Sequence, residues 1–166
     1  MNSPAAQPPP FRLAEPADVD ALVRLVNAAF SVEKFFIEDD RINAEGVRRL
    51  MANGQFLVAP NDAGAGLGGC VYVEHRADRA YLSLLSVHPS RQRSGLGKRL
   101  MDAAEAHARD AGARYMDLRI VDLRLELPEF YRRLGYIVTG TAPFSNDIVT
   151  KRPCHFINMS KPLVPA

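Results

Sequence analysis

The chain has 166 residues, of which 47% are hydrophobic, and its formal net charge is +2 at pH 7. This length suits a single hydrophobic core, and the small charge argues against a general nucleic-acid-binding protein, which would carry a strongly basic face. No apolar run approaches the roughly 20 residues that cross a bilayer. The opening MNSPAAQPPPF has neither the basic start nor the apolar centre of a signal peptide. We therefore expect a cytoplasmic protein without a membrane partner.

Helical signals dominate the first third of the chain. Residues 1–10 are rich in proline and alanine, and we expect a disordered tail there, ahead of one domain at 11–166. From Pro16, which suits a first helical position, apolar residues recur at helical spacing as far as Phe30. Asn43 is placed to cap a second helix that ends at Asn53 and Gly54.

The remainder of the chain is mainly strand-like. QFLVA and LGGCVYVEH are typical of strands, joined by the turn-rich PNDAGAG, and AYLSLLSV is a third strand. A helix with one apolar face follows from Leu96 and stops at Gly112. YMDLRIV indicates a strand, PEFYRRLG a short helix, and YIVTGTA and CHFINMSKPL two closing strands. This order predicts an α/β (α+β) protein in which helices pack on a mixed sheet.

Cysteine and histidine spacing gives no metal or redox motif. Cys70 and Cys154 lie in strand-like stretches without a CxxC spacing, so we expect two buried, reduced thiols. The 4 histidines have no metal-ligand spacing, and no metal site is predicted. His107 falls on the apolar helix face, where we expect a packed side chain.

Two glycine-rich stretches resemble nucleotide-binding motifs only in part. GAGLGG, from Gly64 to Gly69, matches the dinucleotide fingerprint, but a strand follows where a helix is required, so we expect a flexible hairpin turn. GLGKR resembles the end of a P-loop. However, Gln92 stands where the first glycine should be, and Arg99 replaces the required serine or threonine.

The stretch QRSGLG lies between a strand and a helix, where an anion can bind. A helix start leaves about four backbone N–H groups unpaired and carries a partial positive charge. Gly95 and Gly97 remove side chains that would keep a diphosphate away from the backbone. The sequence therefore predicts a pyrophosphate-binding loop, called here the cradle. The alternative is an ordinary basic loop in which the glycines only allow a tight turn. Positive charge around it comes from Arg91, Arg93, Lys98 and Arg99.

Two segments together resemble one enzyme family. The run V-x-P-x-x-Q-x-x-G-x-G resembles the acyl-CoA-binding motif of the GNAT superfamily of N-acetyltransferases; its residues here are Val87, Pro89, Gln92, Gly95 and Gly97. EFYRRLGY at 129–136 is similar to the family's later F-Y-x-x-x-G-[FY] segment. The resemblance implies a mostly antiparallel sheet of about six to seven strands with splayed central strands, flanked by about four helices. It also implies acetyl-CoA or CoA as a partner. Relatives often pair through their C-terminal strands, so a homodimer and a monomer are both open.

The resemblance implies roles for the cradle and for the strand before it. The strand end at Leu85, Ser86 and Val87 would be bulged, and the pantetheine arm would lie beside it. The N–H of Val87 would face the thioester carbonyl and stabilise the oxyanion that forms during attack by an amine. Backbone N–H groups would bind the pyrophosphate of coenzyme A, from Gln92, Arg93, Ser94, Gly95, Leu96, Gly97 and Lys98.

The resemblance implies that Tyr131 presents its hydroxyl to the coenzyme sulfur, as a tyrosine does in relatives. A phenol can donate a proton or a hydrogen bond there as the thiolate departs. Phe130 and Leu134 are spaced i and i+4 and are expected to face the core, which would turn Tyr131 along the helix edge. A packing tyrosine is the alternative.

The general base is the open assignment. Many relatives carry a glutamate on the strand before the cradle, but Ser83 stands at that position and cannot act as a base unaided. Glu74 on the preceding strand is one candidate, acting through water, with a solvated surface carboxylate as the alternative. Arg124 stands where the family has an asparagine. Because neither cysteine has a histidine placed to activate it, direct transfer is favoured.

In relatives the acceptor side lies between the first two helices. Acids there would attract a cationic amine and aromatic rings would pack its body; a solvated surface loop is the alternative. The leading hypothesis is acetyl transfer from acetyl-CoA to a primary amine of a small molecule or peptide in a ternary complex. The alternatives are a non-catalytic acyl-CoA sensor and a protein N-terminal or lysine acetyltransferase. Candidate acceptor-binding residues are Phe35, Phe36, Glu38, Asp39 and Ser83, and the loop PFSNDIVTKRP is a further border.

Overall fold

The computed structural model describes residues 11–61, 66–145 and 147–164. The expected tail at 1–10 and most of the turn before Gly66, including Gly64, lie outside the described residues. In the described part of the chain, no helix has the length and apolar character needed to cross a membrane.

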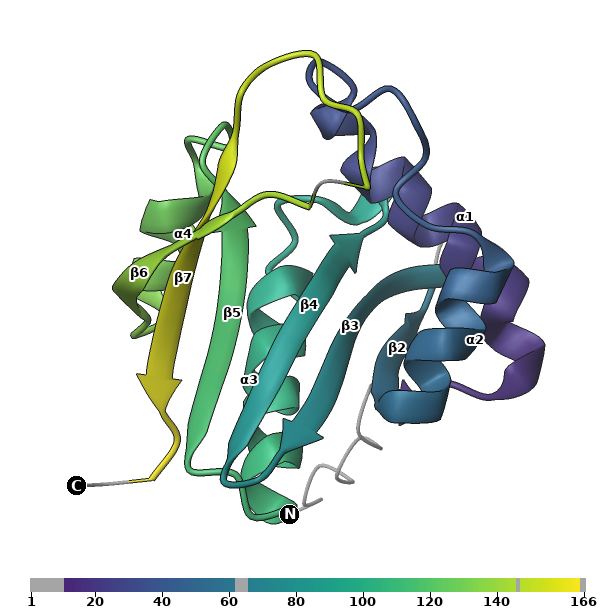
Figure 1. The fold of residues 1–166 in the computed structure, drawn as a ribbon. Helices are drawn as coiled ribbons and strands as arrows, with labels where there is room; N and C mark the ends of the chain where they lie inside the picture. Colours follow the sequence, from purple (N-terminus) through teal and green to yellow (C-terminus); the bar gives the residue numbers. More distant parts are fainter. Residues whose placement is uncertain (1–10, 62–65, 146, 165–166) are drawn as a thin grey trace.

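Seven strands form one sheet in the order β1-β2-β3-β4-β5-β7-β6 (Figure 1). Neighbouring strands are antiparallel except β4 and β5, which are parallel. The predicted mixed, mostly antiparallel sheet is thus confirmed, whereas the two-residue β1 is too short to give a periodic signal. The strands are β1 (Arg12–Leu13), β2 (Gln55–Pro60), β3 (Leu67–Arg76), β4 (Arg79–Val87), β5 (Tyr115–Val121), β6 (Ile137–Pro143) and β7 (His155–Pro162).

The four predicted helices are confirmed. Short 3-10 turns η1 (Pro16–Asp18) and η2 (Phe30–Glu33) flank α1 (Val19–Ala29), and η3 (Pro89–Arg91) follows β4. The Asn43 side chain caps α2 (Ala44–Asn53) by accepting the Gly46 N–H at 2.8 Å. The other two helices are α3 (Leu96–Asp110) and α4 (Leu127–Arg133).

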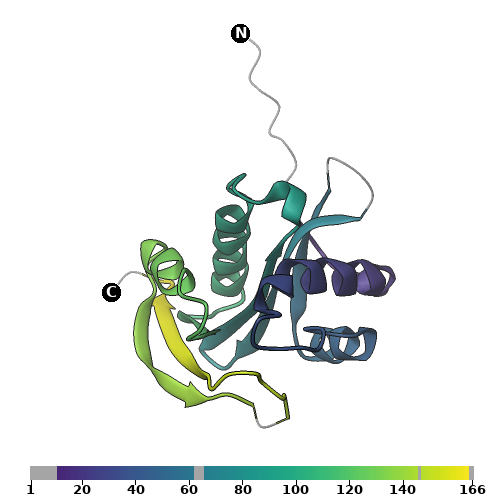
Figure 2. The ribbon, with the colours of Figure 1, turned by 90° about the horizontal axis from the view of Figure 1, so that it is seen from above.

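The helices cover the two faces of the sheet separately (Figure 2). α1 and α2 pack on one face, around a core that contains Leu22, Val26 and Phe56. α3 and α4 pack on the other face, around a core that contains Leu100 and Met116. Burial of each helix's apolar stripe against the sheet removes that surface from water and fixes the layers.

The two parallel strands in the middle of the sheet separate along their length (Figure 1). β4 and β5 pair only where residues 79–81 face residues 115–117. Further along, the pairing of β3 with β4 shifts between Cys70 and Tyr72, where Leu84 takes a left-handed φ of 55°. Such a bulge bends its strand. The bulge therefore starts at Leu84, one residue before the predicted stretch, and leaves a gap beside β5.

Candidate active site

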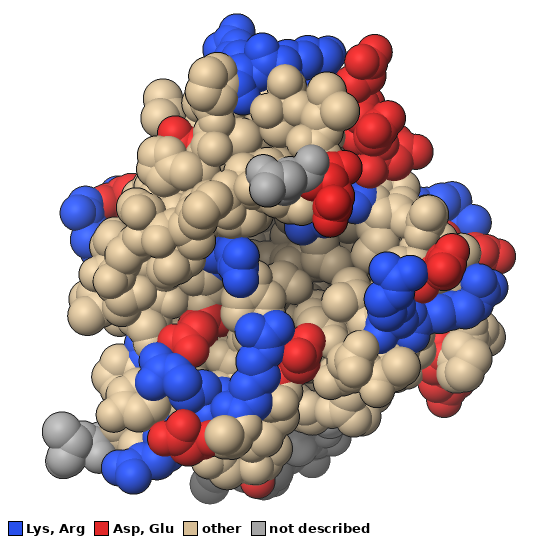
Figure 3. All heavy atoms as spheres, viewed as in Figure 1, with Lys and Arg blue, Asp and Glu red and all other residues tan. Residues whose placement is uncertain are grey.

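A cavity of about 1420 Å³ opens at the gap between β4 and β5. Figure 3 shows the surface hollowed near the centre of this face, with acidic and basic side chains along the rim. Pockets for single small ligands measure about 300–1,000 Å³, so the cavity has room for two substrates. Its walls come from β4, β5, α4, the start of α3, the segment after α1 and the loop after β6.

The start of α3 forms one end of the cavity. Gly95, the residue before the helix, has a φ of +82°, and a Cβ added there would meet no atom within 4 Å. The first helical hydrogen bond runs from the Arg99 N–H to the Gly95 carbonyl at 3.1 Å. Within the described chain, the N–H groups of residues 92–98 have no hydrogen-bond partner. These donors border open space and fit a pyrophosphate.

Most of the residues expected to bind coenzyme A line this cavity, and two do not. The Ser86 hydroxyl is buried and donates to the Leu84 carbonyl at 2.9 Å, and the Ser94 hydroxyl donates to the Arg91 carbonyl. Both side chains therefore point away. The cavity is lined by Leu85, Val87, Gln92, Arg93, Gly95, Leu96, Gly97, Lys98 and Tyr131.

The backbone of Val87 faces the gap. The N–H of the next residue, His88, donates to the Gly68 carbonyl of β3 at 2.8 Å. Since successive N–H groups of a strand point to opposite edges, the Val87 N–H points away from β3 and toward β5. This is the orientation expected of a donor to the thioester carbonyl.

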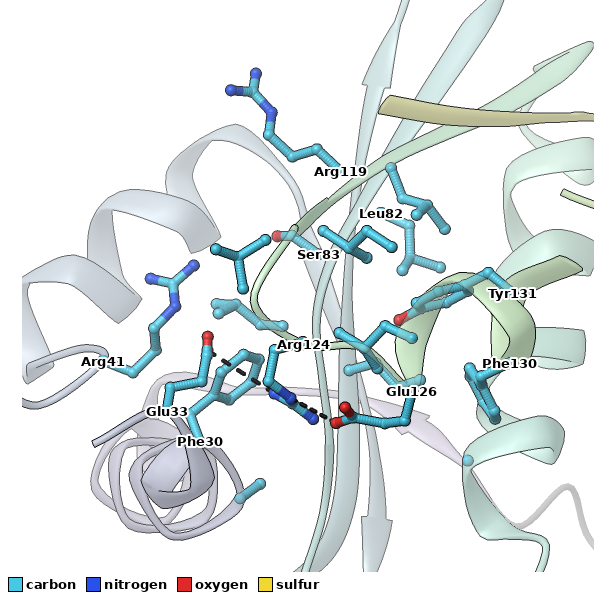
Figure 4. A pocket seen from close by; sticks show the side chains of 18 of the residues that line it. Phe30, Glu33, Arg41, Leu82, Ser83, Arg119, Arg124, Glu126, Phe130 and Tyr131 are labelled. Carbon is cyan, nitrogen blue, oxygen red and sulfur yellow. Dashed lines mark hydrogen bonds and ion pairs between the residues drawn. The ribbon is translucent and has the colours of Figure 1, made fainter. Parts of the chain in front are cut away.

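Tyr131 is buried, and its hydroxyl points into the cavity (Figure 4). Its ring packs edgewise on Phe130 and Tyr136, with centroids 5.0 and 5.9 Å away. Burial raises the pKa of Tyr131 to about 12, and the positive charge of Arg124 opposes this. Phe130 and Leu134 are partly buried and pack against the core, as expected. The expectation that Tyr131 lies along the helix edge is wrong, because Tyr131 is buried in the same core. α4 packs its Tyr131 side against the core shared with α3.

A row of charged side chains that sequence reasoning missed crosses the cavity (Figure 4). The Glu33 side chain is 10% exposed, and its Oε2 is buried without a hydrogen-bond partner. The Nη1 of Arg124 lies 3.8 Å from this oxygen, while the Arg124 Nε donates to Glu126 at 2.6 Å. Burial raises the pKa of Glu33, and Arg124 and Arg41 oppose the rise.

The sequence held one signal for Glu33. It lies three residues after Phe30 and four before Ile37, so it continues the apolar face of the preceding helix. A carboxylate on a buried face is unusual and points to a function. The acceptor-binding residues predicted from the sequence began at Phe35, two residues after Glu33, and so did not include it.

The predicted acceptor residues divide between the cavity and its surroundings. Asp39 and Ser83 line the cavity. Phe36 is fully buried in a small core with Ile37, while Phe35 is 43% exposed and lies under the guanidinium of Arg152. These two rings are therefore not cavity walls, and neither is Glu38. The loop after β6 does border the cavity, through Phe144, Ser145, Asp147 and Ile148.

The structure does not bring Glu74 to the cavity. The Tyr72 hydroxyl donates to its Oε2 at 3.1 Å, and the Arg76 Nε donates to its Oε1 at 3.0 Å. Glu74 is absent from the cavity-lining residues. Its carboxylate has its partners on β3 itself, and we do not propose Glu74 as the general base.

Neither cysteine lies at the cavity. Cys70 is buried, which raises its pKa to about 12, and Cys154 is partly buried; both are free thiols. The Nε2 of His107 lies 2.6 Å from the Gln55 side-chain oxygen. The described residues contain no group of three or more His, Cys, Asp or Glu side chains that could hold a metal.

The gap in the sheet, the donor-rich start of α3 and the inward hydroxyl of Tyr131 are arranged as the resemblance to the acetyltransferase family implies. The model of the acetyltransferase (GNAT) domain matches residues 52–138. The chain belongs to this family, and its fold class is the predicted one.

Several known proteins are similar to the chain. It is 31% identical over 132 residues to a mycothiol acetyltransferase of Propionibacterium freudenreichii subsp. shermanii, covering 75% of this chain and 41% of that protein. The chain thus spans less than half of that relative's length. An aminoglycoside 6'-N-acetyltransferase complexed with coenzyme A superposes with a TM-score of 0.74 at 21% identity, over 94% of this chain and 98% of that chain. A Salmonella typhimurium protein solved with its cofactor acetyl-CoA gives 0.70 at 22% identity, over 94% of each chain.

Proposed function

We propose that the chain transfers the acetyl group of acetyl-CoA directly to a primary amine of a small molecule or peptide, within a ternary complex. The observation that carries this proposal is the single cavity that runs from the start of α3, past Val87 and Tyr131, to the segment after α1. Its two ends have different chemistry: unpaired N–H groups at one, and both acidic and basic side chains at the other.

The start of α3 suits the coenzyme. The unpaired N–H groups of residues 92–98 would hold the pyrophosphate, and the open space beside Gly95 allows close approach to the backbone. When bound, the coenzyme supplies an activated thioester. The Val87 N–H would then donate to the thioester carbonyl and stabilise the oxyanion as the amine attacks.

Tyr131 would act at the sulfur. A pKa of about 12 keeps its phenol protonated at neutral pH, so a donor is always present. A departing thiolate has a conjugate acid with a pKa of about 8.5. Because this thiolate is the weaker base, the Tyr131 hydroxyl stabilises it mainly as a hydrogen-bond donor.

Direct transfer is supported by the positions of the cysteines. An acyl-enzyme route would need an activated nucleophile beside the thioester. Cys70 is buried in the α1 face of the core and Cys154 is not among the cavity-lining residues. Neither thiol is placed to accept the acetyl group.

The acceptor would be a cationic amine. Asp39 and Asp40 line the far end of the cavity and would attract it. Two of the similar proteins are named for acetylation of small molecules, an aminoglycoside and mycothiol. A small amine is therefore the first class to test.

Ser83 favours a second candidate, a non-catalytic acyl-CoA sensor. It lines the cavity at the position where many relatives carry a catalytic glutamate, and a serine alone is not a base. If no other side chain takes the proton, the chain would bind acyl-CoA without turnover.

One assay separates these candidates. Acetyl-CoA binding is measured by calorimetry, and release of free CoA thiol is then followed with pools of polyamines, amino acids, aminoglycosides and peptides. Thiol release that depends on one pool supports the transferase and gives its acceptor class. Binding without release in any pool contradicts amine acetylation by these classes and favours the sensor or a specific protein acceptor.

A further inference from the structure

Direct transfer requires the amine to lose a proton before it attacks, since an ammonium has no lone pair. Ser83 cannot take this proton unaided, and Glu74 lies outside the cavity. We infer that Glu33 is the general base: its carboxylate binds the acceptor ammonium inside the cavity and removes one proton. This inference rests on the proposed acetyl transfer.

The first support is the unpaired oxygen. Glu33 lines the cavity, its side chain is 10% exposed, and its Oε2 has no hydrogen-bond partner. Leaving a buried polar atom unpaired is costly, more so for a charged group, and such atoms are rare in folded proteins. A bound ammonium would donate to this oxygen and remove the cost.

The second support is how Arg124 is held. Its Nη1 lies 3.8 Å from Glu33 Oε2, beyond the range of about 2.7–3.2 Å for a direct hydrogen bond. Its Nε is held by Glu126 at 2.6 Å. Arg124 therefore positions and favours the carboxylate form of Glu33 without occupying the oxygen that would receive the proton.

The third support is the balance of charges around Glu33. Burial and Glu126 favour its neutral form, while Arg124 and Arg41 favour the carboxylate. The charge of Glu33 in turn contributes to a raised pKa of the Cys154 thiol, in the segment before β7. The outcome is a raised pKa, which makes Glu33 a better proton acceptor than an ordinary glutamate.

Each bond and proton can be followed through the reaction. Glu33 takes one proton from the ammonium, and the freed nitrogen lone pair forms the C–N bond at the thioester carbon. The C–S bond then breaks with its electron pair on sulfur. The Tyr131 hydroxyl donates a hydrogen bond to this sulfur as it leaves, and the second nitrogen proton, lost to water as the amide forms, balances the proton that the thiolate then takes up from water. Glu33 finally releases its proton to solvent.

The test compares Glu33→Gln, Glu33→Asp and a matched control, Glu45→Gln, with the wild-type protein across pH 6–10. Glu45 is an exposed carboxylate on α2 paired with Arg49 at 3.2 Å, so its variant should stay within about twofold of wild type. Glu33→Gln should lower kcat/KM for the amine by about 100- to 10,000-fold near neutral pH. Acetyl-CoA affinity should not change, and Glu33→Asp should recover part of the rate.

The pH dependence separates a base from a structural side chain. An amine of pKa about 10 becomes neutral without help at high pH, so the deficit of Glu33→Gln should shrink steadily toward pH 10. A deficit that is constant across this range, or a Glu33→Gln rate within about threefold of wild type, overturns the assignment while amine acetylation stands. If the wild type binds acetyl-CoA but acetylates no amine, the proposed function fails and the base assignment fails with it.

Discussion

The Nη1 of Arg124 and the Oε2 of Glu33 lie 3.8 Å apart across the cavity (Figure 4). Arg124 comes from the loop between β5 and α4, and Glu33 from the end of η2. Arg124 also acts on Tyr131, where its charge opposes the rise in pKa. One guanidinium is thus coupled to both groups that would handle protons in the reaction.

Replacing Arg124 should move the acid limb of the pH profile. The guanidinium favours the charged form of Glu33, so Arg124→Gln should raise the pKa of Glu33 further. The carboxylate would then be available only at higher pH, and kcat/KM would fall more at pH 6 than at pH 9. Arg124→Lys keeps the charge and should shift the limb less. If kcat/KM of wild type and of Arg124→Gln falls at the same pH on the acid side, the coupling between Arg124 and Glu33 is contradicted.

The raised pKa of Glu33 also predicts an effect on stability. The folded protein favours the neutral carboxyl, so ionisation of Glu33 destabilises it above the raised pKa. Below the ordinary value of 4.5 the carboxyl is neutral in both states and this cost is absent. Glu33→Gln should therefore have a higher Tm than wild type at pH 8, with the difference shrinking as the pH falls toward 4.5. Thermal melts measure this difference and need no activity assay. A lower Tm of Glu33→Gln than of wild type at pH 8 would contradict the prediction.

The sequence predicted the features that are local in the chain. The start of α3 follows from glycines and basic residues within one loop, and Asn43 and Gly112 mark helix ends by their own backbone preferences. Amphipathic spacing located α1 and α3, because one stripe of each packs on the sheet.

The sequence could not predict what the sheet brings together. Glu33 and Arg124 belong to distant segments, and only the separation of β4 from β5 makes them walls of one cavity. The family resemblance implied a bulge from Leu85, but its start at Leu84 depends on pairing with β3, which no local pattern reports. Likewise the burial of Tyr131 on α4 was not predicted, because a helix of one or two turns gives too few positions to define a face.

Tyr131→Phe should separate catalysis from binding. The Tyr131 hydroxyl points into the cavity and has no hydrogen bond to a described residue, so its loss should leave the fold and acetyl-CoA affinity nearly unchanged. Turnover should fall by about 10- to 1,000-fold, near the range usual for lost acid catalysis. Tyr115→Phe, on β5 but outside the cavity, is the control. Full activity of Tyr131→Phe in steady-state thiol release would remove this residue from the mechanism.

Substitutions at Gly95 should test the cradle by charge alone. A side chain there projects into open space at the helix start, but the φ of +82° strains any residue other than glycine. Asparagine and aspartate share nearly the same shape, and both are among the residues that best tolerate this conformation, so Gly95→Asn and Gly95→Asp should lose similar stability.

Only the aspartate places a negative charge where the pyrophosphate would bind. Gly95→Asp should therefore bind acetyl-CoA at least about 10-fold more weakly than Gly95→Asn, since tenfold corresponds to about 1.4 kcal/mol of repulsion. Raising the salt concentration should narrow the gap, because screening weakens that repulsion. Calorimetric titration of both variants, with thermal melts as the folding control, measures the difference. Equal affinities of the two variants would mean that the pyrophosphate does not lie at the start of α3.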